Sequence, residues 1–75
     1  DVRGQRAEEA LSAVIKLLDQ AVILGFEHIR IVHGKGNGIL RKYLRDHLKK
    51  YKFISSMADE HADRGGDGIT LVTLK

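Results

Sequence analysis

The chain has 75 residues, a formal net charge of +3, and neither cysteine nor proline. This length allows one small domain, and the lack of cysteine excludes disulfide bonds and thiolate metal sites. No apolar run approaches the roughly 18 residues of a membrane span, and no signal-peptide pattern opens the chain, so we expect a soluble, cytoplasmic protein. The chain starts at Asp1 without an initiator methionine, which suggests a domain from the end of a longer polypeptide.

The first half of the chain is typical of a strand, a long helix and a second strand. Residues 1–4 place an apolar residue between charged ones before a glycine, as at the end of a strand. From residue 6 to residue 24, apolar side chains recur every three or four positions, which predicts an amphipathic helix capped by Gly25. Residues 26–32 alternate isoleucine with polar residues, which predicts a strand.

The second half adds a helix and two strands. Helical spacing resumes over residues 39–51, and residues 53–58 and 69–74 favour extended structure. The polar segment between these strands, residues 59–68, carries three glycines and is expected to be an exposed, mobile connection. The order βαβαββ predicts an α/β domain in which two helices pack on a small mixed sheet.

The predicted topology also places the two ends of the first βαβ unit. A strand, a helix and a second strand normally form a right-handed crossover with parallel strands, and such sheets bind ligands at the carboxyl ends of their strands. If the first two strands are neighbours, four residues with charged or titratable side chains share one site: Asp1, Arg3, His33 and Lys35.

A glycine-rich turn, residues 33–38, leads into the second helix. Its glycines, Gly34, Gly36 and Gly38, with the small polar Asn37, let a ligand approach the backbone and the first N–H groups of the helix, which suits a phosphate. It matches neither a Walker loop nor a dinucleotide fingerprint, so nucleotide binding is the weaker interpretation. A third interpretation is that the glycines serve only a tight turn and a cap.

The residues beside this turn are candidates for phosphodiester chemistry. His33 is a candidate general acid or base, or else a turn residue bonded to the backbone. Arg3 and Lys35 either stabilise charge in a transition state or only bind phosphate. Asp1, the sole nearby carboxylate, is a poor platform for paired metals, and a single loosely held Mg²⁺ is the alternative. Zinc is not expected, because three other histidines lack ligand spacing: His28, His47 and His61.

Positive charge is concentrated in the middle of the chain. Residues 30–52 contain eight basic residues against one acid, a net charge of +7. Four of these cations are predicted to form one ridge on the second helix: Arg41, Arg45, Lys49 and Lys52. Such a ridge fits a polyanion-binding face, and a merely solvated face is the alternative. With no tryptophan and two phenylalanines predicted to be buried, binding should be directed at the backbone and show little sequence specificity.

Three ordered motifs together resemble a known family. The run HGKGNGILRKYLRDHLKK, preceded by DVRG and a long helix and followed by GGDGITLVTLK, is similar to the Smr (small MutS-related) domain, particularly the version that ends the second bacterial MutS-type proteins. The resemblance implies a two-layer βαβαββ fold like the C-terminal domain of translation initiation factor three, with sheet order 1-2-4-3 and the last strand antiparallel. Many Smr domains outside the MutS-type proteins carry histidine where Arg3 stands, and since arginine cannot act as a general base, the base would be His33 or a metal-bound hydroxide. We therefore expect His33 and Asp1 to activate water, with or without Mg²⁺.

The resemblance also implies a function. The family is associated with low-specificity endonuclease activity on DNA, and some members act on RNA or ribosomes. Parent proteins of this type are dimers with an ATPase core and are linked to suppression of recombination and to the rescue of stalled ribosomes; ATP would bind only in those absent parent domains. We therefore expect a nicking endonuclease domain that contacts DNA or rRNA. The alternatives are a non-cleaving anchor for the parent ATPase and a domain that only docks onto that ATPase.

Overall fold

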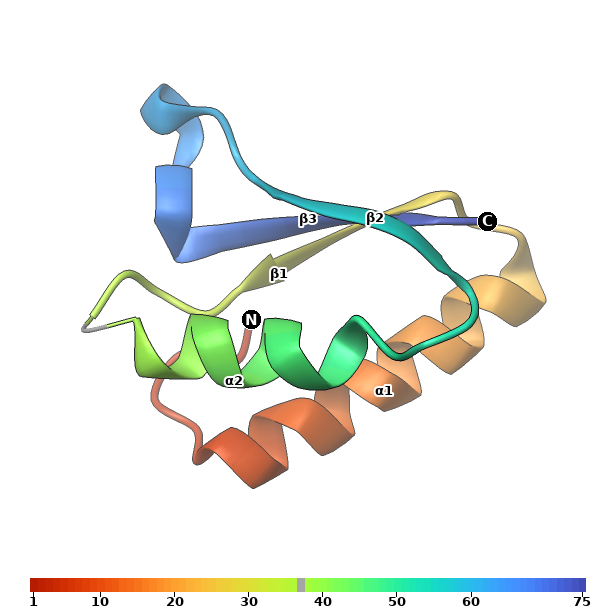
Figure 1. Ribbon diagram of the computed structural model, residues 1–75, viewed down its shortest axis with the longest axis horizontal. Coiled ribbons are helices and arrows are strands. Elements are labelled where there is room, and N and C mark those ends of the chain that lie inside the picture. The colour runs from red at the N-terminus through yellow and green to blue at the C-terminus, as the bar shows by residue number, and fades with distance from the viewer. Residues whose placement is uncertain (37) are drawn as a thin grey trace.

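Two helices cover one face of a three-stranded sheet in the computed structural model, which describes residues 1–36 and 38–75 (Figure 1). Asn37, a predicted phosphate-binding residue, lies outside the described residues. The helices are α1 (Ala7–Leu24) and α2 (Ile39–Leu48), and the strands are β1 (His28–Val32), β2 (Ile54–Asp59) and β3 (Ile69–Leu74). Two short 3-10 turns, η1 (Ala62–Arg64) and η2 (Gly66–Gly68), connect β2 to β3. The predicted two-layer arrangement of helices on a sheet is confirmed.

The strands follow the order β1-β3-β2, and both outer strands run antiparallel to β3. This order and the antiparallel last strand agree with the expectation for these three strands. The register sets Ile31 and Asp59 on either side of Thr70, so these residues form one row across the sheet. The row lies at the end of the sheet that leads into the glycine turn.

The predicted fourth strand is absent from the described residues. Residues 1–4 form a turn, with Gly4 at a φ of 78°, and the sheet is antiparallel throughout instead of mixed. The backbone N–H of Val2 nevertheless donates a 2.8 Å hydrogen bond to the carbonyl of Val32, and the Val2 side chain is buried. A single bond before the chain turns away does not make a ladder, although it fixes this segment beside the end of β1. The similarity to translation initiation factor three stays a prediction.

The core lies between the sheet and the helices. In α1 the buried positions recur every three or four residues, as the sequence pattern predicts: Ala10, Val14, Leu18 and Ala21. Gly25 ends this helix in the left-handed conformation, and its N–H bonds back to the last turn. The second helix buries Leu44 and Leu48 and ends there, three residues earlier than its spacing predicts. Among the described residues, neither helix combines the length and the hydrophobicity needed to span a bilayer.

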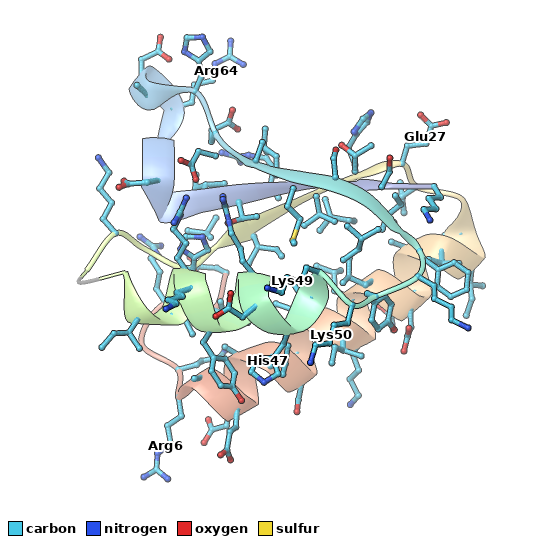
Figure 2. The ribbon with its side chains drawn as sticks, viewed as in Figure 1. Arg6, Glu27, His47, Lys49, Lys50 and Arg64 are labelled. Carbon is cyan, nitrogen blue, oxygen red and sulfur yellow. The ribbon has the colours of Figure 1, made fainter. Side chains whose placement is uncertain are left out.

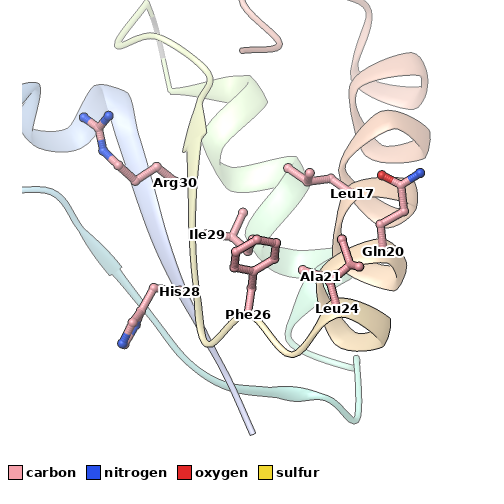
Figure 3. Close-up of a pocket in the computed structure, with 8 residues that line it drawn as sticks. All are labelled: Leu17, Gln20, Ala21, Leu24, Phe26, His28, Ile29 and Arg30. Atoms are coloured by element: carbon pink, nitrogen blue, oxygen red, sulfur yellow. The ribbon is translucent and has the colours of Figure 1, made fainter.

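An open apolar groove of about 510 Å³ lies between α1 and the edge of β1 that does not pair with β3 (Figure 3). Ile29 and Phe26 point toward Leu17 and Ala21 of α1, whereas Arg30 points to the opposite side of the strand. The phenylalanines are not buried as predicted, because Phe26 and Phe53 expose 59% and 51% of their surface. The groove offers mainly hydrophobic contact, and its one arginine, Arg30, is paired with Glu60.

Candidate nucleic-acid interface

Arg3 and the glycine turn lie in contact at the end of β1. The hydrogen bond between Val2 and Val32 brings the N-terminal segment alongside β1, and the Arg3 side chain then crosses Gly34. A Cβ added to Gly34 would lie 3.4 Å from Cγ of Arg3, and Gly34 has a φ of 80°. Glycine is therefore favoured at this position by the backbone conformation, while the contact with Arg3 is at an ordinary van der Waals distance. The two segments that the predicted topology placed at one edge do meet there.

The loop before β3 docks against the same turn. The carbonyl of Gly68 accepts hydrogen bonds from the N–H groups of His33 and Gly34, at 3.1 and 2.9 Å. A Cβ on Gly68 would lie 3.1 Å from Cγ of Lys35, and the Lys35 ammonium lies 3.9 Å from the Asp67 carboxylate. The expectation of a wholly exposed connection is wrong, because Gly66 and Gly68 are buried by this contact. Sequence reasoning missed this part of the site, although the glycine run 65–68 was its signal.

These three segments enclose a shallow depression of about 200 Å³. Its charged lining residues, Arg3 and Lys35, keep 64% and 66% of their side-chain surface exposed. The other lining residues are small or apolar: Val32, Gly34, Gly65, Gly68 and Ile69. A depression with two exposed cations and a glycine backbone can accept an anionic oxygen without steric obstruction.

The backbone of the glycine turn has both partnered donors and donors without a partner among the described residues. Gly34, Gly36 and Gly38 all have positive φ, at 80°, 43° and 81°. The N–H of Gly38 donates to the carbonyl of Lys35, which closes the turn and starts α2. The N–H groups of Lys35 and Gly36 have no hydrogen-bond partner among the described residues. These two donors are therefore available to a ligand.

Asp1 is held by Arg3. The guanidinium binds both carboxylate oxygens, with Nη2 to Oδ2 at 2.6 Å and Nε to Oδ2 at 3.0 Å, and the Arg3 N–H donates to Oδ1 at 3.0 Å. Both side chains are about half exposed, so this ion pair stabilises the fold little and can exchange with solvent ions. The pair is thus ready to open when a phosphate competes for Arg3.

The donor set does not fit a Mg²⁺ ion held by the protein. Mg²⁺ prefers several oxygen ligands, and both oxygens of Asp1 are already bound by a cation. Within residues 1–36 and 38–75, no three histidine, aspartate or glutamate side chains are grouped to hold a metal. We therefore derive no step of the chemistry through a metal ion.

His33 lies behind the glycine turn instead of in the depression. It is 5% exposed, and both ring nitrogens have partners: Nδ1 lies 2.9 Å from the Gly34 carbonyl oxygen and Nε2 lies 2.7 Å from Oγ1 of Thr70. In this arrangement neither nitrogen faces water. The geometry thus favours the interpretation of His33 as a backbone-bonded turn residue over that of a general base.

The predicted basic ridge divides into two parts. Arg41 and Arg45 turn toward the sheet, where each donates to Oδ1 of Asp59, at 2.9 and 2.6 Å. Lys49 and Lys52 are exposed, and Lys52 lies beyond the end of the helix, so helical spacing does not place it. Lys49 and its neighbour Lys50 mark this second part at the C-terminal end of α2 (Figure 2).

Asp59 partly neutralises the arginine half of the ridge. The hydrogen bond from Arg41 is the main reason that the pKa of this carboxyl lies below its ordinary value of 3.8, and the charge of Arg45 acts in the same direction. Asp59 therefore stays ionised and competes with any phosphate for both guanidinium groups. Sequence reasoning did not single out Asp59, because it sits in another strand 14 to 18 residues away.

Comparison with known proteins identifies similar sequences over the full length. A family model described as the Smr domain matches residues 1–75. The putative endonuclease MutS2 of Bacillus subtilis is 48% identical over 75 residues, which is 100% of this chain and 10% of that protein, and endonuclease MutS2 of Staphylococcus carnosus is 44% identical with the same coverage. The chain thus spans about a tenth of the length of these relatives.

Two solved structures share the fold. The crystal structure of the Smr domain of Thermus thermophilus MutS2 has a TM-score of 0.96 and 41% identity, covering 100% of this chain and 94% of that one. YdaL, a stand-alone small MutS-related protein from Escherichia coli, has a TM-score of 0.88 and 25% identity, covering 99% of this chain and 64% of that one.

Proposed function

Because the chain belongs to the Smr domain family, we propose that it binds the phosphodiester backbone of nucleic acid and nicks it as a low-specificity endonuclease domain. The observation that carries this proposal is that Arg3 and Lys35 line one depression, and that the backbone N–H groups of Lys35 and the adjacent Gly36 have no partner among the described residues. The endonuclease names of the MutS2 relatives support the same reaction class.

Binding is assigned to the depression and to the cations near it. A backbone phosphate accepts hydrogen bonds from Arg3 and from the N–H groups of Lys35 and Gly36, while the Lys35 ammonium neutralises its charge. Lys49 and Lys52 would contact flanking phosphates, and Arg41 and Arg45 would join them on leaving Asp59. None of these groups reads base edges, so little sequence specificity is expected.

The hydrolytic step is assigned to Asp1, Arg3 and Lys35. When the phosphate takes the guanidinium of Arg3, the Asp1 carboxylate is released beside it and can accept a proton from water. The water oxygen then bonds to phosphorus, the bond to one ester oxygen breaks, and that oxygen takes a proton from solvent. Arg3 and Lys35 stabilise the charge that develops on the phosphoryl oxygens.

A second candidate function is a non-cleaving anchor for DNA, rRNA or the ribosome. The burial of His33 favours it, since only one carboxylate is then left beside the depression as a base. Both candidates use the same phosphate contacts and differ only in the chemical step.

The role within a larger protein follows from the family and is also a proposal. We place the domain in a cytoplasmic, dimeric MutS-type ATPase, where it would act on DNA during suppression of recombination or on stalled ribosomes. The third candidate, a domain that docks only onto its parent ATPase, would need no free phosphate-binding donors.

A combined assay separates these functions. The purified domain is incubated with supercoiled plasmid and with structured RNA, with Mg²⁺ or with EDTA, and both binding and nicking are measured. Nicking supports the endonuclease, and salt-dependent binding without nicking supports the anchor. Absence of binding to either polymer at low salt would refute both.

A further inference from the structure

A continuous chain of hydrogen bonds runs from the basic ridge to the glycine turn. Nε of Arg45 donates to Oγ1 of Thr70 at 3.1 Å, and that oxygen lies 2.7 Å from Nε2 of His33. The opposite ring nitrogen of His33 lies 2.9 Å from the carbonyl oxygen of Gly34. Thr70 stands in the middle and is 2% exposed, so water does not compete for its hydroxyl.

Arg45 and the Gly34 carbonyl, at the two ends of this chain of hydrogen bonds, determine which atoms between them carry the protons. A carbonyl oxygen can only accept, so Nδ1 of His33 carries the proton that Gly34 receives. In the neutral ring Nε2 is then an acceptor, and the Thr70 hydroxyl donates to it while its oxygen accepts from Arg45. Every donor and acceptor is satisfied by one tautomer, as a buried polar network requires.

The Nδ1–H tautomer of His33 bears on the orientation of the backbone N–H of Lys35, a residue that lines the depression. His33 holds the Gly34 carbonyl inward, and the peptide that joins Gly34 to Lys35 is trans and planar. The N–H of Lys35 therefore points away from His33, antiparallel to that carbonyl. This N–H has no partner among the described residues and belongs to a residue that lines the depression.

We propose that Thr70 is a positioning residue of this site, whose hydroxyl holds His33 in the Nδ1–H tautomer and thereby aims the Lys35 N–H at a bound phosphate. The last step rests on the proposed function, since it takes a phosphodiester as the ligand of the depression. The hydroxyl at residue 70 touches no ligand; it acts only through His33. Arg45 supports it by donating to the same oxygen while Asp59 holds the other end of the guanidinium.

The test compares the wild type with Thr70→Val and Thr70→Ser. Long-range ¹⁵N–¹H correlation spectra report which nitrogen of His33 carries the proton, and titration of a short DNA duplex over a range of salt reports affinity. We expect the Nδ1–H tautomer in the wild type and in Thr70→Ser, and a mixture of tautomers in Thr70→Val. Affinity should fall roughly 3- to 10-fold in Thr70→Val, the value of one hydrogen bond, and recover in Thr70→Ser.

The salt dependence of the affinity for DNA distinguishes a positioning role of Thr70 from the loss of a positive charge. Thr70→Val removes no charge, so the slope of log affinity against log salt should stay that of the wild type, unlike the slope of a lysine or arginine variant. An Nε2–H tautomer in the wild-type protein would overturn the inference without any variant, even if Thr70→Val failed to fold. Wild-type affinity in Thr70→Val, or equal loss in Thr70→Ser, would also overturn it. If the wild type bound no DNA, the proposed function would fail, while the tautomer would still decide the role of Thr70.

Discussion

The side chain of Arg3 packs across Gly34, so that a Cβ at residue 34 would lie 3.4 Å from Cγ of Arg3. This contact joins the N-terminal segment and the turn after β1 into one site. The glycine turn is therefore half of a phosphate-binding depression, and the N-terminal segment is the other half.

Replacement of Gly34 by alanine should weaken DNA binding by straining the turn against which Arg3 packs. The variant forces a Cβ into the left-handed region at φ 80° and into contact with Arg3, at a stability cost of about 1–2 kcal/mol for the backbone alone. Gly25→Ala is the matched control, because Gly25 has a φ of 81° and open space around its Cβ position. Thermal denaturation should show similar losses in both variants, and fluorescence anisotropy should show weaker binding only in Gly34→Ala. Equal affinities would mean that the position of Arg3 is immaterial.

Replacement of Asp59 by asparagine should strengthen binding. The change removes the carboxylate that holds Arg41 and Arg45, which releases Arg41 and leaves Arg45 only its Nε hydrogen bond to Thr70, so that more N–H groups can reach phosphates. We expect roughly one additional phosphate contact, seen as a steeper dependence of log affinity on log salt. Glu60→Gln is the control, since it removes the same charge from the neighbouring residue, whose partner is Arg30. If both variants gained affinity equally, net charge alone would explain the effect.

The same carboxylate predicts a dependence of stability on pH. The Arg41 hydrogen bond keeps the pKa of Asp59 in the folded state below its ordinary value of 3.8. A carboxyl with a depressed pKa stabilises the fold above the unfolded-state pKa, and this contribution is lost as the pH falls through the folded-state pKa. Asp59→Asn should therefore lower the melting temperature at pH 7 and lose this effect as the pH falls below the pKa of Asp59 in both the folded and the unfolded state. A difference in melting temperature between the wild type and Asp59→Asn that did not change with pH would contradict this prediction.

Replacement of Asp1 by asparagine should separate cleavage from binding. If Asp1 is the base, nicking should fall by roughly 10²-fold or more, whereas affinity should stay the same or rise because Arg3 loses its competitor. EDTA should leave the binding affinity of the wild type unchanged, since the donor set of the site does not fit a metal. Unimpaired nicking by Asp1→Asn would remove Asp1 from the chemical step.

Much of this fold follows from periodicity. The spacing of apolar residues predicts α1 closely, and the β-branched run 69–74 predicts β3 with its observed bounds. Periodicity fails in two places. Val2, in the predicted first strand, has a single backbone hydrogen bond to β1, and α2 ends at Leu48 although Tyr51 continues the apolar spacing. The periodicity of apolar residues does not predict side-chain hydrogen bonds across the sheet.

The candidate site, like the fold, could be predicted from the sequence only in part. The sequence predicts that residues 1–4 and 33–38 meet, because a crossover brings strand ends together. It does not predict that His33 faces Thr70, which depends on the register of β3 against β1, or that Arg45 faces Asp59, which depends on how α2 packs against the sheet. The docking of the 65–68 loop was missed because a polar, glycine-rich composition does not distinguish a buried turn from an exposed one.

The most direct measurement is a salt titration of duplex DNA binding with two double variants of equal charge. Arg3→Gln/Lys35→Gln removes both cations of the depression, and Arg6→Gln/Lys16→Gln removes two cations that do not line it, one just before α1 and one within it (Figure 2). The depression variant should lose most of its affinity at low salt and reduce the slope of log affinity against log salt by about two, while the α1 variant keeps nearly the wild-type slope. Equal slopes and affinities for the two variants would contradict the assignment of the depression as the phosphate-binding site.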